Sequence, residues 1–370
     1  MIHHMRKSLL LLCCVLITYS VNAHAINQAN KNAISIAGKS AGTLNKDTLA
    51  RPLKKAVPTK KAVPLNKAKV VDRDSPNNFS VDNSIGKIYG TLTMPKGMQK
   101  VPVVLMIGGS GPTDRNMNQV QALRTNSFLL LAKGLAANGI ASLRYDKRGV
   151  GASTGAANDA NLTLDDFIND ANLLVSKLAS DDRFSEIIVL GHSEGATIGL
   201  ITALITKPAA FISFSGYENN MVTLIGKQLK PALSPRDYNI YTEVADSLKA
   251  GKIVNRNFPS VLAPIFTRTS QVFLISTMKY DTSTEIQKLE IPVLVIGGTT
   301  DLQIQAEAAT QLANSNQRAT LKIIQGMNHV LKRAPADRRL NIATYDNPRL
   351  PLHEDIIPVL TSFIKAHLKE

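Results

Sequence analysis

The sequence predicts an α/β fold with a mostly parallel central sheet and helices on both faces. Short runs of β-forming apolar residues alternate with helical segments on both sides of residues 216–290. Several of these apolar runs end in glycine-rich turns, as at 108–111 and 297–298. Repeated βα units build a parallel sheet that is covered on both faces. In such sheets, binding sites form at the carboxyl ends of the strands.

The individual elements follow from the periodicity of the apolar residues. Residues 79–94 predict two antiparallel strands with a turn at 83–86. Continuous apolar runs predict buried strands at 101–107, 140–144, 187–190, 210–214, 292–298 and 320–324. Helices are predicted at 127–138, 164–179, 196–205, 303–313 and 355–368. Thr163, followed three residues later by Asp166, predicts a capping box for the second of these helices.

The amino-terminal residues 1–25 predict a secretory signal peptide. Arg6 and Lys7 precede an apolar run at 9–18, and Ala-His-Ala at 23–25 is a small-x-small cleavage site. An uncleaved anchor is the alternative, although the run is short for a bilayer span. We therefore expect an exported protein, periplasmic or secreted.

Both cysteines of the chain, Cys13 and Cys14, lie within this signal segment. The mature chain would then contain no cysteine, which excludes disulfides, thiolate chemistry and cysteine-based metal sites. A domain of this size can instead rely on its apolar core.

Residues 26–75 carry most of the net charge of +15. They contain eleven Lys or Arg and three Asp, a net charge of +8, and residues 1–25 add +2, which leaves +5 for residues 76–370. Few large apolar residues occur there, so we predict a disordered basic linker. This linker has two alternative roles: a solvated spacer, or a segment that makes weak contact with an anionic envelope surface. Because the charge lies in this tail, it does not indicate a nucleic-acid partner.

The remaining chain divides into a core and an insertion. Residues 76–215 and 291–370 contain the alternating strands and helices of the predicted core. Between them, residues 216–290 contain helical patches but no comparable buried strand. We predict that this stretch is an inserted helical cap over the active site.

The pattern Gly191-His192-Ser193-Glu194-Gly195 follows the apolar run at 187–190. It is the signature of a nucleophile elbow, a sharp strand-to-helix turn that presents a serine. The pentapeptide alone arises by chance in roughly one chain in ten of this length, given ordinary glycine frequencies. Its place between a predicted strand and a predicted helix makes Ser193 a candidate nucleophile.

An acid and a histidine follow Ser193 in the order that this layout demands. Asp301 comes after the predicted strand at 292–298, and His329 comes after the strand at 320–324. His329 would take the proton of Ser193, and Asp301 would hold the imidazole and stabilise its cation. Alternatively, Asp301 caps the next helix and His329 is a surface-loop histidine. The rival base is His353, and the rival acids are Glu307 and Asp346.

Backbone N–H groups must stabilise the oxyanion that forms during acyl transfer. We expect one from Glu194, which follows the nucleophile, and another from Gly109 or Ser110 in the loop after the strand at 101–107. This glycine-rich loop could also hold a phosphate, but it lacks the Gly-Lys-Ser/Thr ending of a P-loop. Four nearby charged residues are interpreted as structural salt-bridge or turn residues: Asp114, Arg115, Asp146 and Arg148.

Five ordered blocks carry a family resemblance. They are GSGPTDRN (109–116), RYDKRGVG (144–151), GHSEG (191–195), GTTDLQ (298–303) and MNHVLK (327–332). With these blocks, residues 79–368 resemble an α/β-hydrolase of the bacterial serine carboxylesterase group, related to serine aminopeptidases and dienelactone hydrolases. The resemblance implies a Ser193–His329–Asp301 triad, no cofactor, no metal, and hydrolysis of small carboxylic esters.

Three functions remain open from the sequence. The leading hypothesis is an exported serine esterase that acts through an acyl-enzyme. The second keeps the same triad but acts on peptides or amides, as an aminopeptidase or amidase does. The third is a non-catalytic module bound to the envelope, against which the retention of all three triad candidates argues. The sequence predicts neither the acyl-chain length nor the oligomeric state.

Overall fold

The computed structural model describes residues 77–120, 123–155 and 160–368. The predicted signal peptide (1–25) and basic linker (26–75) lie outside the described residues. Within the described part of the chain, no helix is long and apolar enough to cross a membrane.

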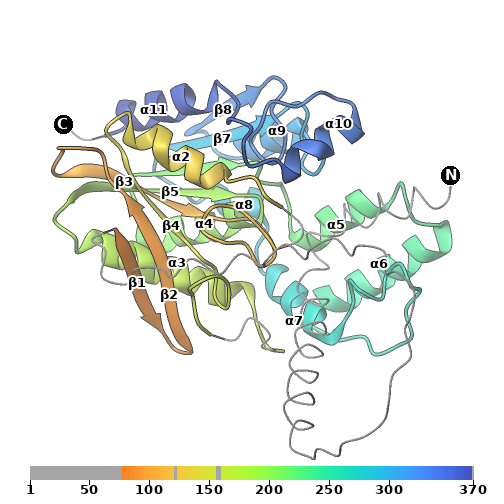
Figure 1. The fold of residues 1–370 in the computed structure, drawn as a ribbon. Coiled ribbons are helices and arrows are strands. Elements are labelled where there is room, and N and C mark those ends of the chain that lie inside the picture. The colour runs from red at the N-terminus through yellow and green to blue at the C-terminus, as the bar shows by residue number, and fades with distance from the viewer. Residues whose placement is uncertain (1–76, 121–122, 156–159, 369–370) are drawn as a thin grey trace, which may run out of the picture.

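An eight-stranded sheet forms the centre of the molecule, in the order β1-β2-β4-β3-β5-β6-β7-β8 (Figure 1). β1 pairs with β2 and β2 with β4 in antiparallel fashion, and every other pairing is parallel. The prediction of a mostly parallel sheet is confirmed. The strands are β1 (Asn78–Asn83), β2 (Gly86–Thr93), β3 (Val101–Ile107), β4 (Ala141–Tyr145), β5 (Phe184–His192), β6 (Ala210–Phe214), β7 (Val293–Gly298) and β8 (Ala319–Ile324).

Helices cover both faces of this sheet, as predicted. The helices α2 (Ser127–Ala136) and α11 (Ile356–Ala366) lie on one face, which is the upper one in Figure 1. On the opposite face lie α3 (Leu164–Ala179), α4 (Glu194–Thr206) and α9 (Ala306–Asn314). Alternate side chains of β3 enter the two apolar layers, because successive residues of a strand point to opposite faces.

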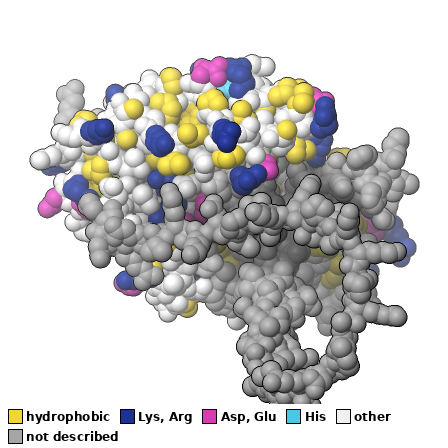
Figure 2. All heavy atoms as spheres, viewed as in Figure 1, with side chains coloured by type: hydrophobic (Ala, Val, Ile, Leu, Met, Phe, Trp, Pro, Cys, Tyr) yellow, Lys and Arg dark blue, Asp and Glu magenta, His cyan; other side chains and the backbone are white. Residues whose placement is uncertain are grey.

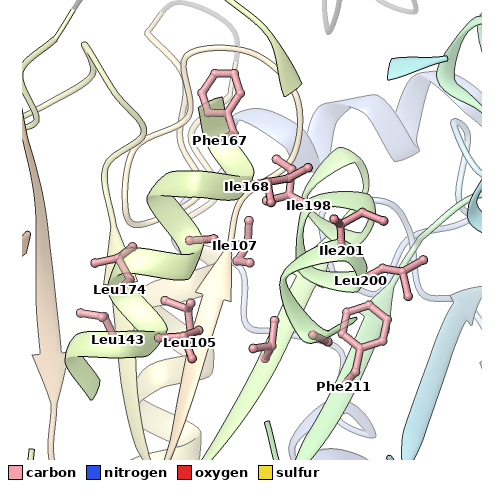
Figure 3. Close-up of a cluster of buried hydrophobic side chains, with 14 of the residues drawn as sticks. Leu105, Ile107, Leu143, Phe167, Ile168, Leu174, Ile198, Leu200, Ile201 and Phe211 are labelled. Atoms are coloured by element: carbon pink, nitrogen blue, oxygen red, sulfur yellow. The ribbon is translucent and has the colours of Figure 1, made fainter. Parts of the chain in front are cut away.

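Helix α4 is the most deeply buried of these helices. All of its residues from 194 to 203 are buried, and the side chain of Ile198 lies beside that of Ile168 on α3, near the end of β3 (Figure 3). A helix that is apolar all round is stable only in the interior of a protein. The packing of α4 therefore fixes its first residue, Glu194, against the carboxyl end of the sheet.

Residues 216–290 contain four helices and no strand, and the structure describes this whole stretch. The first three of these helices share an apolar cluster that also includes Ile304 and Ala308, from the segment after β7. The fourth instead places Ile286 in the apolar layer that contains α3, α4 and α9. Their assignment as a cap over the active site stays a prediction. The helices are α5 (Met221–Leu229), α6 (Pro235–Lys249), α7 (Arg268–Thr277) and α8 (Thr282–Ile286).

The structure differs from the predicted elements near the carboxyl terminus. The helix predicted at 303–313 begins only at Ala306, because the N–H groups of Gln303 and Ile304 donate to the Asp301 side chain instead. Helix α10 (Arg338–Ala343) and the 3-10 helix η1 (Thr344–Asp346) were not predicted. The capping box of α3 is confirmed, since the carboxylate of Asp166 accepts the N–H of Thr163.

Charged side chains are dispersed on the face shown in Figure 2. Among the residues coloured there, Lys and Arg side chains stand apart from one another, and several lie beside Asp or Glu. No large basic patch is therefore seen among the coloured residues of that face.

Candidate active site

Ser193 occupies the turn between β5 and α4. Its backbone has φ 55° and ψ −123°, a conformation that residues with a side chain rarely adopt. A Cβ atom added to Gly191 would lie 2.0 Å from the Gly195 carbonyl oxygen. One added to Gly195 would lie 2.3 Å from the carbonyl oxygen of Ile107. At both positions the neighbouring backbone lies too close for any side chain, so glycine is required, as the elbow pattern indicates.

Asp301 and His329 meet at the ends of the two neighbouring strands β7 and β8. The Nδ1 atom of His329 lies 2.8 Å from Oδ2 of Asp301, and both residues are buried. A carboxylate can only accept here, so His329 carries its proton on Nδ1, and in its neutral form its Nε2 is free to act as a base. The sequence-predicted acid and base are thus brought together.

The electrostatics of Asp301 favour the carboxylate. Burial alone would raise its pKa, but the charge and hydrogen bond of His329 hold the pKa below the usual value. Its second oxygen, Oδ1, accepts the N–H groups of Gln303 at 2.8 Å and Ile304 at 2.9 Å. One carboxylate oxygen of Asp301 therefore stabilises the turn after β7, and the other pairs with the imidazole of His329.

One cavity joins the predicted residues. Ser193, His329, Gly109 and Ser110 all line it. Among the described residues no hydrogen bond joins Ser193 to His329, which is common for catalytic pairs before substrate binds. The other lining residues are Thr113, Met117, Gln119, Leu123, His192, Gln303 and Val330.

The backbone donors predicted for an oxyanion lie beside Ser193. Glu194 is the first residue of α4, and its N–H has no acceptor among the described residues; the same holds for the N–H groups of Gly109 and Ser110. A Cβ atom added to Gly109 would lie 3.2 Å from the Ser193 Cβ, so the loop after β3 closely approaches the serine. Free N–H groups around one serine suit an anion that forms there.

Comparisons with known proteins agree with this geometry. A family model described as serine aminopeptidase, S33, matches residues 124–233. Esterase EstD of Thermotoga maritima is 26% identical over 267 residues, which are 70% of this chain and 62% of that protein. Est1E from Butyrivibrio proteoclasticus, solved with ferulic acid bound, has a TM-score of 0.52 at 18% identity. That match covers 78% of this chain and 98% of Est1E.

A second solved structure, the α/β hydrolase GrgF from Penicillium sp. sh18, gives a TM-score of 0.51 at 17% identity. The match covers 78% of this chain and 98% of GrgF. The chain has the α/β-hydrolase fold. The placing of its candidate residues after β3, β5, β7 and β8 is that of this fold.

The rival residues lie elsewhere in this fold. Nε2 of His353 donates to the carbonyl oxygen of Gln325 at 2.9 Å, and His353 does not line the cavity of Ser193. Asp346 forms an exposed ion pair with Arg124. Glu307 lines a different cavity, between α5 and α9. The structure therefore favours His329 over His353 as the candidate base, and Asp301 as the carboxylate that pairs with it.

The charged residues around the loop after β3 form structural contacts, as interpreted from the sequence. Arg115 pairs with Asp146 at 2.6 Å, and Arg148 pairs with Asp170 at 2.8 Å. Oδ1 of Asp114 accepts the N–H groups of Asn116 and Asn118, which closes a turn. Within 77–120, 123–155 and 160–368, no group of three or more His, Cys, Asp or Glu could hold a metal ion.

His192 is a residue of the site that sequence reasoning placed in the elbow without a role. Its Nε2 donates to the carbonyl oxygen of His329 at 2.8 Å, and the two rings lie 4.7 Å apart. Burial, together with the nearby His329, lowers the pKa of His192 to about 3. His192 is therefore neutral at ordinary pH and holds the backbone of His329. Its position next to the serine was the only signal in the sequence.

Asp301→Asn should reduce the loss of stability in acid. The pKa of Asp301 is lower in the folded protein than in the unfolded chain, where it is about 4. Ionised Asp301 therefore stabilises the fold above that value, and the stabilisation is lost as the pH falls through the folded pKa. Because an amide does not titrate, the free energy of unfolding should fall less in the variant than in the wild type as the pH is lowered from about 5 towards 3.

Urea unfolding at several pH values measures this difference. The same substitution at the exposed Asp182 is the control. If lowering the pH reduced the free energy of unfolding equally in the Asp301 variant and the wild type, the lowered pKa of Asp301 in the folded protein would be contradicted.

Proposed function

We propose that this protein is an exported serine hydrolase that cleaves small carboxylic esters through Ser193, His329 and Asp301. The observation that carries the proposal is the hydrogen bond between Asp301 and His329 beside a strained serine in the same cavity. The similarity to esterase EstD supports an ester substrate. The chain spans 62% of the length of that relative, so the activity is proposed on the geometry of this chain's own site.

The proposed reaction begins when the Ser193 hydroxyl attacks the ester carbonyl carbon. Nε2 of His329 accepts the hydroxyl proton, since Nδ1 is already bonded to Asp301. The carbonyl oxygen becomes an oxyanion, which accepts the N–H of Glu194 and that of Gly109 or Ser110. The C–O bond to the alcohol then breaks, and His329 returns the proton to the departing alkoxide.

A water molecule completes the cycle. His329 removes its proton as the water oxygen attacks the acyl carbon, and a second oxyanion forms in the same position. Collapse of this intermediate releases the carboxylic acid and returns the proton to Ser193. Throughout, the ionised Asp301 stabilises the imidazolium, which is the reason its low pKa matters.

Ser193→Ala should abolish the hydrolysis of short p-nitrophenyl esters. The methyl group cannot attack the ester, and loss of a triad nucleophile lowers kcat by at least about 10³-fold. Initial rates measure the effect, and circular dichroism verifies that the variant is folded. Ser180→Ala, at the exposed end of α3, is the matched control and should keep full activity. Full activity in folded Ser193→Ala would contradict the proposal.

The second candidate function is a peptidase or amidase with the same triad, and the matching family model favours it. An aminopeptidase needs an acidic group for the free ammonium of its substrate. None of the described residues that line the cavity of Ser193 is Asp or Glu, and the carboxylate of the adjacent Glu194 is engaged by a lysine. The lining of the site thus supports an ester over an aminoacyl substrate.

Short esters should accordingly be turned over with a higher kcat/KM than aminoacyl anilides. Both substrates are measured with the same enzyme preparation, and Ser193→Ala gives the background for each. A higher kcat/KM for the anilides would favour the peptidase instead. If neither class is turned over and a fluorophosphonate fails to label Ser193, the protein is a non-catalytic binding module.

Export rests on residues 1–25, and we expect the chain to be cleaved after Ala25. The mature protein recovered from the periplasm or medium of a bacterial host should then begin at Ile26, as shown by its intact mass. A control carrying Leu10→Lys and Leu11→Lys within the apolar run should remain in the cytoplasm. Recovery of the uncleaved chain in the membrane fraction would indicate an anchor. In the mature protein, the basic linker at 26–75 would offer weak contact with an anionic envelope surface.

A further inference from the structure

Lys147 is a buried lysine that follows β4 and contacts two residues of the candidate site. Its Nζ donates to the carbonyl oxygen of Gly109 at 2.6 Å and to Oε1 of Glu194 at 3.0 Å. The side chains of Lys147 and Glu194 are 2% and 0% exposed. The ring of Phe167 lies 4.9 Å from the ammonium and covers it. No step of the proposed reaction uses this ammonium.

The two partners of Lys147 belong to the two halves of the proposed oxyanion site. Gly109 lies in the loop after β3, and Glu194 begins α4. The proposed mechanism uses only backbone N–H groups of these two segments, those of Glu194 and of Gly109 or Ser110, which donate to the oxyanion. Lys147 instead binds the carbonyl of one residue and the side chain of the other, so it connects both halves without touching the cavity.

The geometry of the peptide bond gives this connection a direct effect on the donors. In a trans peptide the C=O of Gly109 and the N–H of Ser110 point in opposite directions in one plane. An ammonium that fixes the Gly109 oxygen therefore fixes the direction of the Ser110 N–H. That N–H has no acceptor among the described residues, and Ser110 lines the cavity of Ser193.

Neighbouring contacts complete the restraint on this loop. Nε2 of Gln119 donates to the carbonyl oxygen of Ser110 at 2.6 Å, and the Thr113 hydroxyl donates to the same oxygen at 3.1 Å. These contacts tie the loop to itself, because Gln119 and Thr113 belong to the segment that follows β3. Lys147 alone among the three ties the loop to α4 as well.

We propose that Lys147 is a positioning residue, which sets the distance and direction between the oxyanion donors by binding the Gly109 carbonyl and the Glu194 carboxylate together. The proposal rests on the proposed esterase function of the same site. Removing the link lets the loop after β3 shift relative to α4, and a displacement of about 1 Å at a reacting centre lowers the rate by about 10²-fold.

Lys147→Met tests the proposal, since methionine keeps most of the length and volume but cannot donate. We expect kcat on a short p-nitrophenyl ester to fall about 10²-fold, as expected for a misplaced oxyanion donor, while KM changes less than about threefold. A trifluoromethyl ketone, which forms an oxyanion when Ser193 adds to it, should lose affinity by about the same factor as kcat. A role limited to stabilising the fold would not produce this parallel loss.

Arg148→Met is the matched control. Arg148 is the next residue, is also buried, and pairs with the buried Asp170. Its guanidinium lies 5.7 Å from the same Phe167 ring, but it does not contact Gly109 or Glu194. We expect this variant to lose stability in urea while kcat and the affinity for the ketone stay within about threefold of the wild type. Equal losses of kcat in the two variants would show that Lys147 is merely structural.

Lys147→Met combined with Glu194→Met covers the case in which the single variant fails to fold. Removing one partner of a buried ion pair leaves an unpaired charge, whereas replacing both with apolar residues of similar size is often tolerated. The double variant should fold and show the same loss of kcat and of ketone affinity. If either folded variant keeps wild-type kcat while Ser193→Ala is inactive, the role of Lys147 is refuted and the esterase proposal stands. If Ser193→Ala keeps its activity, the esterase proposal itself fails.

Discussion

The close backbone contact at the start of α4 is the constraint on which the site depends. Gly195 lies so near the carbonyl oxygens of Ile107 and Gly108 that a methyl group there would overlap both. This contact places the first turn of α4 directly against the end of β3. The loop that follows β3 must then pass beside Ser193, which brings N–H groups of both segments that have no acceptor among the described residues close to that serine. A larger residue at 195 would separate the two segments and dismantle the site.

The buried charges of the site follow from the same packing. A charge removed from water is costly unless it is paired, and each buried charge near Ser193 has a partner. Asp301 faces His329, and Lys147 faces Glu194. Oε2 of Glu194 is buried without a partner, so the carboxylate depends on the lysine alone among the described residues. Fixed dipoles and paired charges in a dry site are what stabilises a developing oxyanion without reorganisation.

Local pattern was sufficient for most of the fold. The bounds of β3 and α3 were predicted to the residue, because an uninterrupted apolar run and a capping box are properties of adjacent residues. The delayed start of α9 was not predicted, since it depends on Asp301 accepting two N–H groups that the helix would otherwise use. Helix α10 was missed because its short, mostly exposed sequence has little apolar periodicity.

The predicted site residues divide in the same way. Ser193, Asp301 and His329 could be predicted as candidates because each follows a strand whose apolar run is visible in the sequence. His192 and Lys147 lie in the blocks at 191–195 and 144–151, but they could not be given roles, since their partners lie 137 and 47 residues away. Long-range hydrogen bonds of buried polar groups are decided by the packing of the sheet, which the sequence pattern predicts in outline only.

Gln303 links helix α5 with the candidate acid Asp301. Its N–H donates to Oδ1 of Asp301, and its carbonyl oxygen accepts the side chain of Gln228 on α5. The same residue lines both the cavity of Ser193 and the larger cavity between α5 and α9. The backbone of Gln303 therefore joins α5 to the carboxylate that pairs with His329. The helices of 216–290 and the support of the candidate acid thus share one residue, because packing of α5 fixes the carbonyl group of the residue whose N–H group holds Asp301.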